Sequence, residues 1–390
     1  MAINFRSNTI IKNLRIGPLS GGGNGGGGGS SEPTYLIVGS RGDNTYRGAG
    51  FVFEISNLSN TPTKLVTSDN LIGATLGTAA SAFDSTIALS ARGASEETGA
   101  VYVYDSTNLS ASATKLTAFD GAEGDKFGQS VTVSSTKIAV GAHLDDSYKG
   151  AVYVYDKSNL STTPTKLTAY DAANFDRFGY SAGSSGTVLA VGSPEDDDNG
   201  SSSGAVYVYN TGNLSSAPTK LVPSDVSGGD YFGKSVFVTS NHIVAGANES
   251  QAVYVYDVSN LSAAPTKLTP YDGISSARYG EVVAASDTHI VVTAYDDNSS
   301  RGSVYVYDAT NLSTTPTKLQ GVSTSDYFGI SVAVLGSVLA VGAERVDSSS
   351  YSDDGAVYVY DLDNLSSSPT VLLSSTAIGN GNFGSSVTLL

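Results

Sequence analysis

The chain has 390 residues, with 44 glycines, no cysteine and no tryptophan, and its formal net charge at pH 7 is −16. The absence of cysteine excludes disulfides, thiolate metal ligands and a cysteine nucleophile, and the acidic balance argues against binding to nucleic acid or to an anionic membrane surface. No apolar run approaches the roughly 18 residues of a membrane span, so membrane insertion is not expected.

The first segment of the chain, residues 1–20, mixes large apolar side chains with basic ones and lacks the continuous apolar core of a secretory signal peptide. The glycine-rich run that follows has high backbone entropy and few side chains to bury, so residues 21–34 are predicted to be a flexible tether. A disordered tail does not need so many large apolar side chains, and we therefore expect residues 1–20 to attach to another protein. The predicted contact residues are Ile3, Phe5, Arg6, Ile10, Ile11, Lys12, Leu14, Arg15 and Ile16.

A repeated segment organises residues 35–390. The sequence Gly-Ala-Val-Tyr-Val-Tyr-Asp at residues 150–156 recurs with small changes, and its copies begin at residues 48, 99, 150, 204, 251, 302 and 355. Alternating Val and Tyr predict a strand. Each unit carries three further strand patterns: one that opens with Phe-Gly (residues 127–133), one like residues 138–142, and a short one centred on a lysine such as Lys166. Four strands in a repeat of about fifty residues predict a propeller blade.

The two ends of the repeat complete each other. The chain enters the repeat on a second strand at Tyr35–Ser40 and ends on a first strand at Phe383–Leu389. Pairing these two strands would complete a seventh blade and remove the free edges of an open array. We therefore predict an all-β fold, a seven-bladed β-propeller of four-stranded blades that occupies residues 35–390.

The residues that flank the strands resemble a known family. Phe-Gly opens one strand, and Val-Gly-Ala or Val-Gly-Ser-Pro, as at residues 191–194, ends the next. This pattern resembles the FG-GAP repeat of integrin α-subunit propellers, and the resemblance covers residues 35–390. It implies the propeller fold and leaves the activity open. The calcium loop that this family often carries between the first and second strands is absent, because connections such as residues 134–137 contain no carboxylate.

Acidic residues gather in two other connections of each unit. Asp145 and Asp146 lie between a second and a third strand, whereas Asp120 and Asp171 each precede a first strand. In a four-stranded antiparallel blade these two connections lie at the same end of the strands, so one face of the ring is predicted to be acidic. Most of these residues are typical turn formers. The best candidate cation ligands are Glu195, Asp196, Asp197 and Asp198.

Two further motifs are explained by their places in the repeat. Arg41-Gly42-Asp43 is the tripeptide that integrins bind, but it falls where other units carry ordinary loop residues, and we interpret it as a chance occurrence. Asn-Leu-Ser is formally a glycosylation site. Its fixed place between the third and fourth strands instead predicts a turn in which the Asn side chain bonds the backbone two residues on. The motif begins at Asn57, Asn108, Asn159, Asn213, Asn260, Asn311 and Asn364.

No candidate catalytic set emerges from the sequence. The three histidines, His143, His242 and His289, do not occupy corresponding positions in their units. Most tyrosines lie in the third strands, where we expect them to pack between blades rather than to form a sugar-binding platform. We predict that the protein is not an enzyme and needs no cofactor.

Two functions remain open at this stage. The layout of an attachment peptide, a tether and a rigid domain is typical of a structural protein of a virion, such as a bacteriophage fibre, tail or capsid-decoration protein. Such a protein would be made in the host cytoplasm, would bind other virion proteins through residues 1–20, and could bind a host surface receptor or glycan through the propeller. The alternative is a secreted or cell-surface propeller that serves adhesion or ligand binding.

Overall fold

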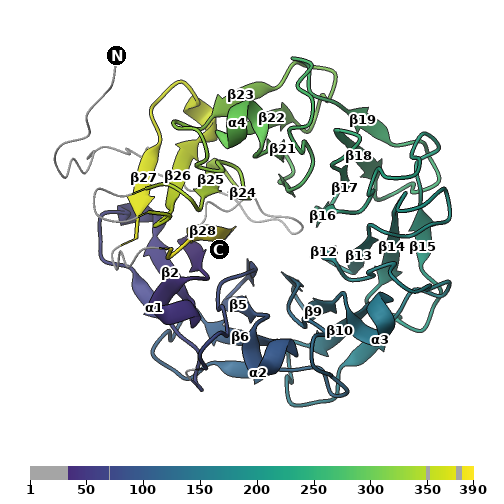
Figure 1. Ribbon diagram of the computed structural model, residues 1–390, viewed down its shortest axis with the longest axis horizontal. Coiled ribbons are helices and arrows are strands. Elements are labelled where there is room, and N and C mark those ends of the chain that lie inside the picture. Colours follow the sequence, from purple (N-terminus) through teal and green to yellow (C-terminus); the bar gives the residue numbers. More distant parts are fainter. Residues whose placement is uncertain (1–33, 70, 348–351, 375–379) are drawn as a thin grey trace, which may run out of the picture.

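A computed structural model of the chain describes residues 34–390 except 70, 348–351 and 375–379. Seven four-stranded antiparallel sheets are arranged as blades around a central axis (Figure 1). The predicted all-β, seven-bladed propeller is therefore confirmed. Residues 1–20, which we expect to form the attachment peptide, and all of the tether except residue 34 lie outside the described residues.

The blades are numbered here from the one that contains the first described strand, with each blade's strands given from the axis outwards. Blade 1 contains β28 (Phe383–Leu389), β1 (Tyr35–Ser40), β2 (Ala49–Glu54) and β3 (Thr63–Leu65); blade 2 contains β4 (Ala80–Phe83), β5 (Thr86–Ala91), β6 (Ala100–Asp105) and β7 (Thr114–Leu116). Blade 3 contains β8 (Ser130–Val133), β9 (Lys137–Ala142), β10 (Ala151–Asp156) and β11 (Thr165–Leu167); blade 4 contains β12 (Ser181–Ser185), β13 (Val188–Ser193), β14 (Ala205–Asn210) and β15 (Thr219–Leu221). Blade 5 contains β16 (Ser235–Val238), β17 (His242–Ala247), β18 (Ala252–Asp257) and β19 (Thr266–Leu268); blade 6 contains β20 (Val283–Ala285), β21 (His289–Ala294), β22 (Ser303–Asp308) and β23 (Thr317–Gln320). Blade 7 contains β24 (Ser331–Leu335), β25 (Val338–Ala343), β26 (Ala356–Asp361) and β27 (Thr370–Leu373).

The hydrophobic core consists of layers between neighbouring blades. Val101 and Leu116 of blade 2, for example, pack in one cluster with Ile138 and Tyr153 of blade 3. Each blade is thus covered on both faces, which explains why the second and third strands are buried along most of their lengths instead of alternating between core and solvent. The third-strand tyrosines belong to these layers, as predicted, and Tyr153 is completely buried.

The prediction that the Phe-Gly pair begins the first strand is wrong in blades 2–7, where the pair lies before the strand; blades 2 and 6 carry Leu76-Gly77 and Tyr279-Gly280 in its place. In blade 3 the strand starts at Ser130, three residues after Phe127. The backbone N–H of Phe127 instead donates to Thr98 O, in the preceding blade, at 2.9 Å. The ring of Phe127 packs edge to face on Tyr153 of its own blade, with 5.5 Å between centroids. Phe-Gly therefore joins two blades rather than extending a strand.

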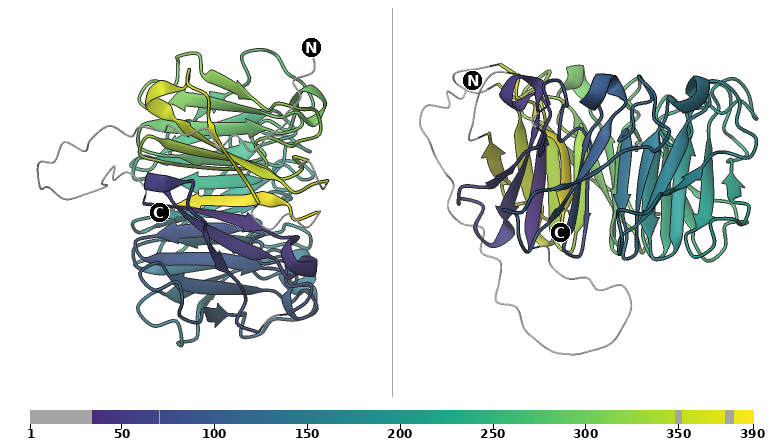
Figure 2. Two further views of the ribbon diagram at one scale, coloured as in Figure 1. Left: turned by 90° about the vertical axis from the view of Figure 1, so that its left-hand side faces the viewer. Right: turned by 90° about the horizontal axis from the view of Figure 1, so that it is seen from below.

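The two faces of the ring differ (Figure 2). One face, called here the helix face, carries the connections between second and third strands, which include the single-turn helices α1 (Asp43–Tyr46), α2 (Ala94–Glu97), α3 (Asp145–Tyr148) and α4 (Asp297–Ser300). The opposite face, called the terminal face, carries Tyr35 and Leu390. The short 3-10 helices η1 (Ile55–Asn57) and η2 (Leu362–Asn364) directly follow third strands.

The ring is closed by pairing of its last and first described strands, as predicted. β28 runs antiparallel to β1, with Leu389 opposite Leu36 and Val387 opposite Val38. At the terminal face the N–H of Tyr35 donates to Leu390 O at 2.8 Å, and the N–H of Leu390 donates back to Tyr35 O at 2.9 Å. Closure leaves the first strands around a central channel of about 1160 Å³. Within the described residues, no helix is long and apolar enough to cross a membrane.

Removing the closing strand should abolish the fold. Deletion of residues 383–390 exposes β1 and takes away three buried side chains, Phe383, Val387 and Leu389. Burial of each contributes about 1.5–3 kcal/mol, and the sum rivals the roughly 5–15 kcal/mol that stabilises a typical domain. We expect an insoluble or protease-sensitive product. The milder Phe383→Ala variant should fold but lose about 3–5 kcal/mol in denaturant unfolding; a wild-type midpoint for either variant would contradict this closure.

Candidate functional site

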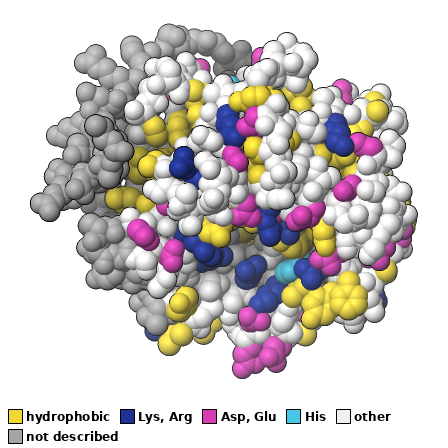
Figure 3. Space-filling model, turned by 45° about the horizontal axis from the view of Figure 1, so that its top comes forward, with side chains coloured by type: hydrophobic (Ala, Val, Ile, Leu, Met, Phe, Trp, Pro, Cys, Tyr) yellow, Lys and Arg dark blue, Asp and Glu magenta, His cyan; other side chains and the backbone are white. Residues whose placement is uncertain are grey.

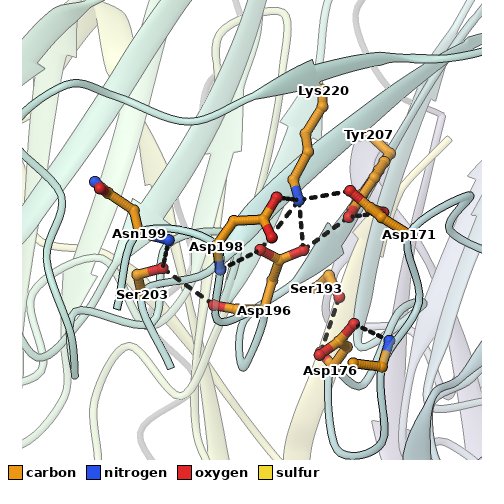
Figure 4. A network of polar contacts seen from close by, with 10 residues as sticks. Asp171, Asp176, Ser193, Asp196, Asp198, Asn199, Ser203, Tyr207 and Lys220 are labelled. Atoms are coloured by element: carbon orange, nitrogen blue, oxygen red, sulfur yellow. Dashed lines mark hydrogen bonds and ion pairs between the residues drawn. The ribbon is translucent and has the colours of Figure 1, made fainter. Parts of the chain in front are cut away.

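A lysine from the fourth strand is enclosed by carboxylates on the helix face. In blade 4 the Nζ of Lys220 lies 2.9 Å from Asp171 Oδ2, 2.8 Å from Asp196 Oδ2 and 2.5 Å from Asp198 Oδ2 (Figure 4). The hydroxyl of Tyr207 lies 2.7 Å from both Asp171 Oδ1 and Asp196 Oδ2, so its one proton can be donated to either carboxylate. Asp171 comes from the connection before β12, and Asp196 and Asp198 come from the connection between β13 and β14. Lysine and tyrosine together therefore compensate the buried charge of Asp196.

This lysine cage recurs around the ring. In blade 3 Lys166 contacts Asp120 at 2.7 Å and Asp145 at 2.9 Å, which confirms that the two acidic connections lie on one face. Simpler versions pair one lysine with one carboxylate at 2.6–2.8 Å: Lys64 with Asp43, Lys115 with Asp69, and Lys267 with Asp225. Blade 6 has the full set, with Lys318 held by Asp272 and Asp297. The acidic face is therefore extensively ion-paired.

Blade 7 supports a structural role for the cage. Val371 replaces the lysine there, and Ser323 stands where blades 2–6 carry the aspartate five residues after the preceding lysine. Lysine and aspartate are thus lost together, as expected if each is needed only to compensate the other.

The predicted cation ligands separate into two groups in the structure. Asp196 and Asp198 converge with Asp171, and carboxylate oxygens of these three residues lie within 4.8 Å of one another. Glu195 instead pairs with Arg177 at 3.2 Å, and Asp197 accepts a hydrogen bond from the N–H of Ser202. In the described cluster the ammonium of Lys220 already occupies the position where the three carboxylates converge.

The pKa shifts reflect this balance of burial and pairing. Although burial opposes it, hydrogen bonds to the three aspartates raise the pKa of Lys220, so the lysine stays charged. Burial raises the pKa of Asp176 to about 6, against one backbone hydrogen bond from Ala173 and with added repulsion from Asp196. Asp176 thus lies close to the cage but has no cation of its own among its hydrogen-bond partners (Figure 4).

The Arg41-Gly42-Asp43 tripeptide is part of the fold, in agreement with its interpretation as a chance occurrence. Asp43 is buried and pairs with Lys64 at 2.8 Å, in the place that Asp145 takes in blade 3. Arg41 Nη2 lies 2.8 Å from Glu344 Oε1 across the blade junction. The tripeptide therefore does not present a free aspartate to a partner.

The Asn-Leu-Ser segments form turns, and the predicted bond from the backbone two residues on is present in three copies, at Ser59, Ser161 and Ser313. The N–H and hydroxyl of Ser161 both donate to Asn159 Oδ1, at 3.3 and 2.6 Å. A serine hydroxyl bonds the asparagine two residues before it in all seven copies. These asparagines stabilise the exit from the third strand.

The centre of the helix face is where the blades differ most. The residue directly after each second strand lies on the helix face, next to the residues that surround the channel mouth, and it takes six identities in the seven blades: Arg41, Arg92, His143, Pro194, Asn248, Tyr295 and Glu344. These side chains contact the residues that follow the Phe-Gly pairs. Arg92 Nη1 bonds Gln129 Oε1 at 2.7 Å, and Asn248 Nδ2 bonds Glu281 Oε2 at 2.7 Å. The fold does not require one residue type here, so this mouth is the candidate ligand-binding site.

Sequence comparison of the units could have found the mouth. The sequence-based predictions were drawn from the lysines, aspartates and tyrosines that the units share, and they missed the position after each second strand, where seven units carry six different residue types. Of the histidines, His143 is at the mouth, whereas His242 and His289 begin second strands near the terminal face. Within the described residues the three histidines do not form a common site.

Comparison with known proteins identifies the repeat. A family model described as FG-GAP repeat matches residues 111–155, 162–209, 216–256, 265–307 and 320–360, which together make up more than half of the chain. No curated protein matches the sequence.

Removal of the caged lysine should be far more costly than removal of an exposed one. The Lys220→Met variant leaves Asp196, whose side chain is 4% exposed, without its cation, and we expect a loss of about 3–5 kcal/mol in unfolding free energy. The matched control is Lys267→Met, because its partner Asp225 is 51% exposed; this pair should contribute at most about 1 kcal/mol. Similar losses for the two variants would show that the cage is not buried as described.

Metal removal should leave stability almost unchanged. Because the ammonium of Lys220 holds the convergence point of the three aspartates, a divalent cation would have to displace it. We expect the same Tm, within about one degree, in EDTA and in calcium. A saturated tight site would shift the unfolding free energy by a few kcal/mol and the Tm by several degrees, so such a shift would show that the acidic residues bind metal.

Proposed function

Because the chain belongs to the FG-GAP repeat family, whose propellers are generally binding or structural domains rather than enzymes, we propose that it is a non-enzymatic structural protein of a bacteriophage virion. In this proposal residues 1–20 anchor it to other virion proteins, residues 21–34 act as a tether, and the propeller presents its helix face for assembly or for binding to a host surface. A fibre, a tail and a capsid-decoration protein all fit this arrangement.

The observation that carries the proposal is the separation of the two faces. The described chain begins at Thr34, whose N–H donates to Leu390 O on the terminal face. The channel mouth where the blades differ lies on the opposite face, because the connections between second and third strands are there. A segment that precedes Thr34 therefore starts from the side away from the mouth, and an anchor there would leave the mouth free.

The closed ring also favours an anchor outside the blades. Closure pairs β28 with β1 inside blade 1, and the outermost strands are only three or four residues long, as at β3 and β27. Such short edges offer little backbone for pairing with another protein. An extended peptide could supply the missing contact by adding a strand to a partner or by filling a groove on it.

A secreted or cell-surface binding propeller is the second candidate. The variation at the mouth favours ligand binding whatever the propeller is attached to. The two candidates differ in where the protein is found: in purified particles, or at the surface of the cell that makes it.

Deletion of residues 1–20 should separate folding from assembly. We expect the truncated protein to be a soluble propeller with a wild-type Tm, because residues 34–390 complete the ring, but to be missing from purified particles in quantitative mass spectrometry. The matched control replaces residues 21–29 by a Gly-Ser linker of equal length, which should leave incorporation unchanged because only reach and flexibility matter there. Normal incorporation of the truncated protein would assign docking to the blades instead.

A further inference from the structure

Two exposed aromatic rings stack on each other where blades 3 and 4 meet on the helix face. The ring centroids of Tyr148 and Phe175 are 5.3 Å apart, with 18° between the ring planes. Tyr148 ends α3, and Phe175 lies in the connection to β12. Their exposed fractions are 42% and 57%. A pair of large rings in solvent is unusual in a protein whose other aromatic rings mostly lie between the blades.

Phe175 departs from the repeat at a position that suits glycine. Its φ is 77°, in the left-handed region, where a bulky side chain is a rare and strained choice. The corresponding residues of blades 2, 3 and 5 are Gly73, Gly124 and Gly229, with φ of 79°, 87° and 87°, and blades 6, 7 and 1 carry the small polar residues Ser276, Ser325 and Asn380 there. The fold is satisfied by glycine here, so an exposed phenylalanine at this position indicates a function of its side chain.

A cluster of cations adjoins this aromatic pair. The backbone N–H of Arg177, two residues after Phe175, donates to Tyr148 O at 2.9 Å. Burial lowers the pKa of His143 to about 3, and four nearby cations add to this effect. These cations are Arg177, Arg92, Lys126 and Lys234. Figure 3 shows the helix face obliquely, with Lys and Arg side chains gathered around the central hollow and exposed hydrophobic groups beside them.

Some of these mouth residues have unused hydrogen-bonding capacity. Lys126, Arg177 and Lys234 are each paired with a glutamate, and the Lys234 contact is the longest, at 3.8 Å from Glu281 Oε1. Among the described residues, Arg92 has no carboxylate within 4 Å, and its guanidinium bonds the amide oxygen of Gln129. His143 is 7% exposed, and its Nδ1 has no hydrogen-bond partner. Buried polar groups without partners are uncommon and call for an explanation.

We propose that this sector of the mouth, formed by Arg92, His143, Tyr148, Phe175, Arg177 and Lys234, binds a saccharide that carries an anionic group. The inference rests on the binding role proposed above for the helix face. The aromatic pair offers its surface to the C–H groups of a sugar ring, and Arg92 and Lys234 offer charged donors to a carboxylate or a phosphate. The free Nδ1 of His143 adds a neutral hydrogen-bonding group.

The chemistry of the mouth favours a saccharide over a peptide. The lining residues at the mouth beside the cations are polar, namely Thr78, Gln129, Tyr180 and Lys234, whereas valines and phenylalanines line the channel farther from this mouth. Peptide recognition commonly relies on buried apolar anchors in fitted pockets, and these four polar residues offer none. A polar ligand with one charged group matches both the aromatic surface and the cations.

The binding experiment uses the full chain and compares four probes by calorimetry or ligand-observed NMR. A glucuronate-containing tetrasaccharide and glucose 6-phosphate distinguish a carboxylate from a phosphate as the anionic group. Maltotetraose tests a neutral saccharide, and inorganic phosphate tests the anion without a sugar. We expect one or both charged saccharides to bind at least about tenfold more tightly than maltotetraose and than inorganic phosphate, as one charge-assisted hydrogen bond allows.

Matched variants identify the surface. Phe175→Gly introduces the residue that blades 2, 3 and 5 carry, so it should keep or raise the Tm while weakening binding of the charged saccharide about two- to tenfold. Its control is Phe119→Ala, because Phe119 is also 57% exposed but lies in another connection. Arg92→Gln should remove the preference for charged over neutral saccharides. Its control is Arg345→Gln, since Arg345 lies over Tyr327, at 4.4 Å from the ring centre, outside the sector.

Three outcomes would overturn the proposal. These are no measurable binding of either charged saccharide, equal binding of charged and neutral saccharides, and wild-type binding by Phe175→Gly. Tight binding of inorganic phosphate alone would replace the saccharide site by a plain anion site. The saccharide proposal and the anchoring proposal can fail separately. A chain without residues 1–20 should lose incorporation into particles and keep saccharide binding. Arg92→Gln should keep incorporation and lose the preference for charged saccharides.

Discussion

The ring depends on one close backbone contact between neighbouring blades. Gly150, directly before β10, lies so near Phe178 of the next blade that a Cβ at position 150 would be 2.0 Å from Phe178 O. The N–H of Phe178 donates to Lys149 O at 2.9 Å, and its ring packs on Tyr207 at 5.5 Å. Phe178 thus makes a backbone hydrogen bond to the previous blade and an aromatic contact inside its own blade. Together these contacts set the spacing and the tilt between the two blades. The contact recurs at Gly48, Gly99, Gly204, Gly302 and Gly355.

The sequence predicts the fold well because the information is local and repeated. The alternation of Val and Tyr identifies the third strands, and the position of Tyr35–Ser40 and Phe383–Leu389 at opposite ends of the repeat predicts the closure. The Phe-Gly pair was misplaced for a physical reason. The residues after the pair have the sequence pattern of a strand, but the backbone of Phe127 bonds the preceding blade. A contact between blades leaves no pattern in the local sequence from which it could be predicted.

The lysine cages could be recognised only in part from the sequence. Lysines and aspartates were visible as separate repeated features, but Lys166 and Asp120 are 46 residues apart and meet only because the chain returns to the helix face. Their joint loss at Val371 and Ser323 was the available signal. The mouth presents the opposite case. Its residues follow no common pattern. In a chain of near-identical units, positions where the residue differs between units, such as Phe175, are therefore the ones that indicate function.

Closure by β28 also determines the order in which the molecule can be completed. Blades 2 to 7 are each formed by strands that are close together in the chain, so they can form as the polypeptide emerges from the ribosome. Blade 1 cannot form in this way, because Leu36 pairs with Leu389, which is synthesised almost last. Bringing such distant segments of the chain together is also slow. During synthesis β1 therefore keeps an unpaired edge that is open to other nascent chains. The protein is most vulnerable to misassembly in the interval before its last strand is released.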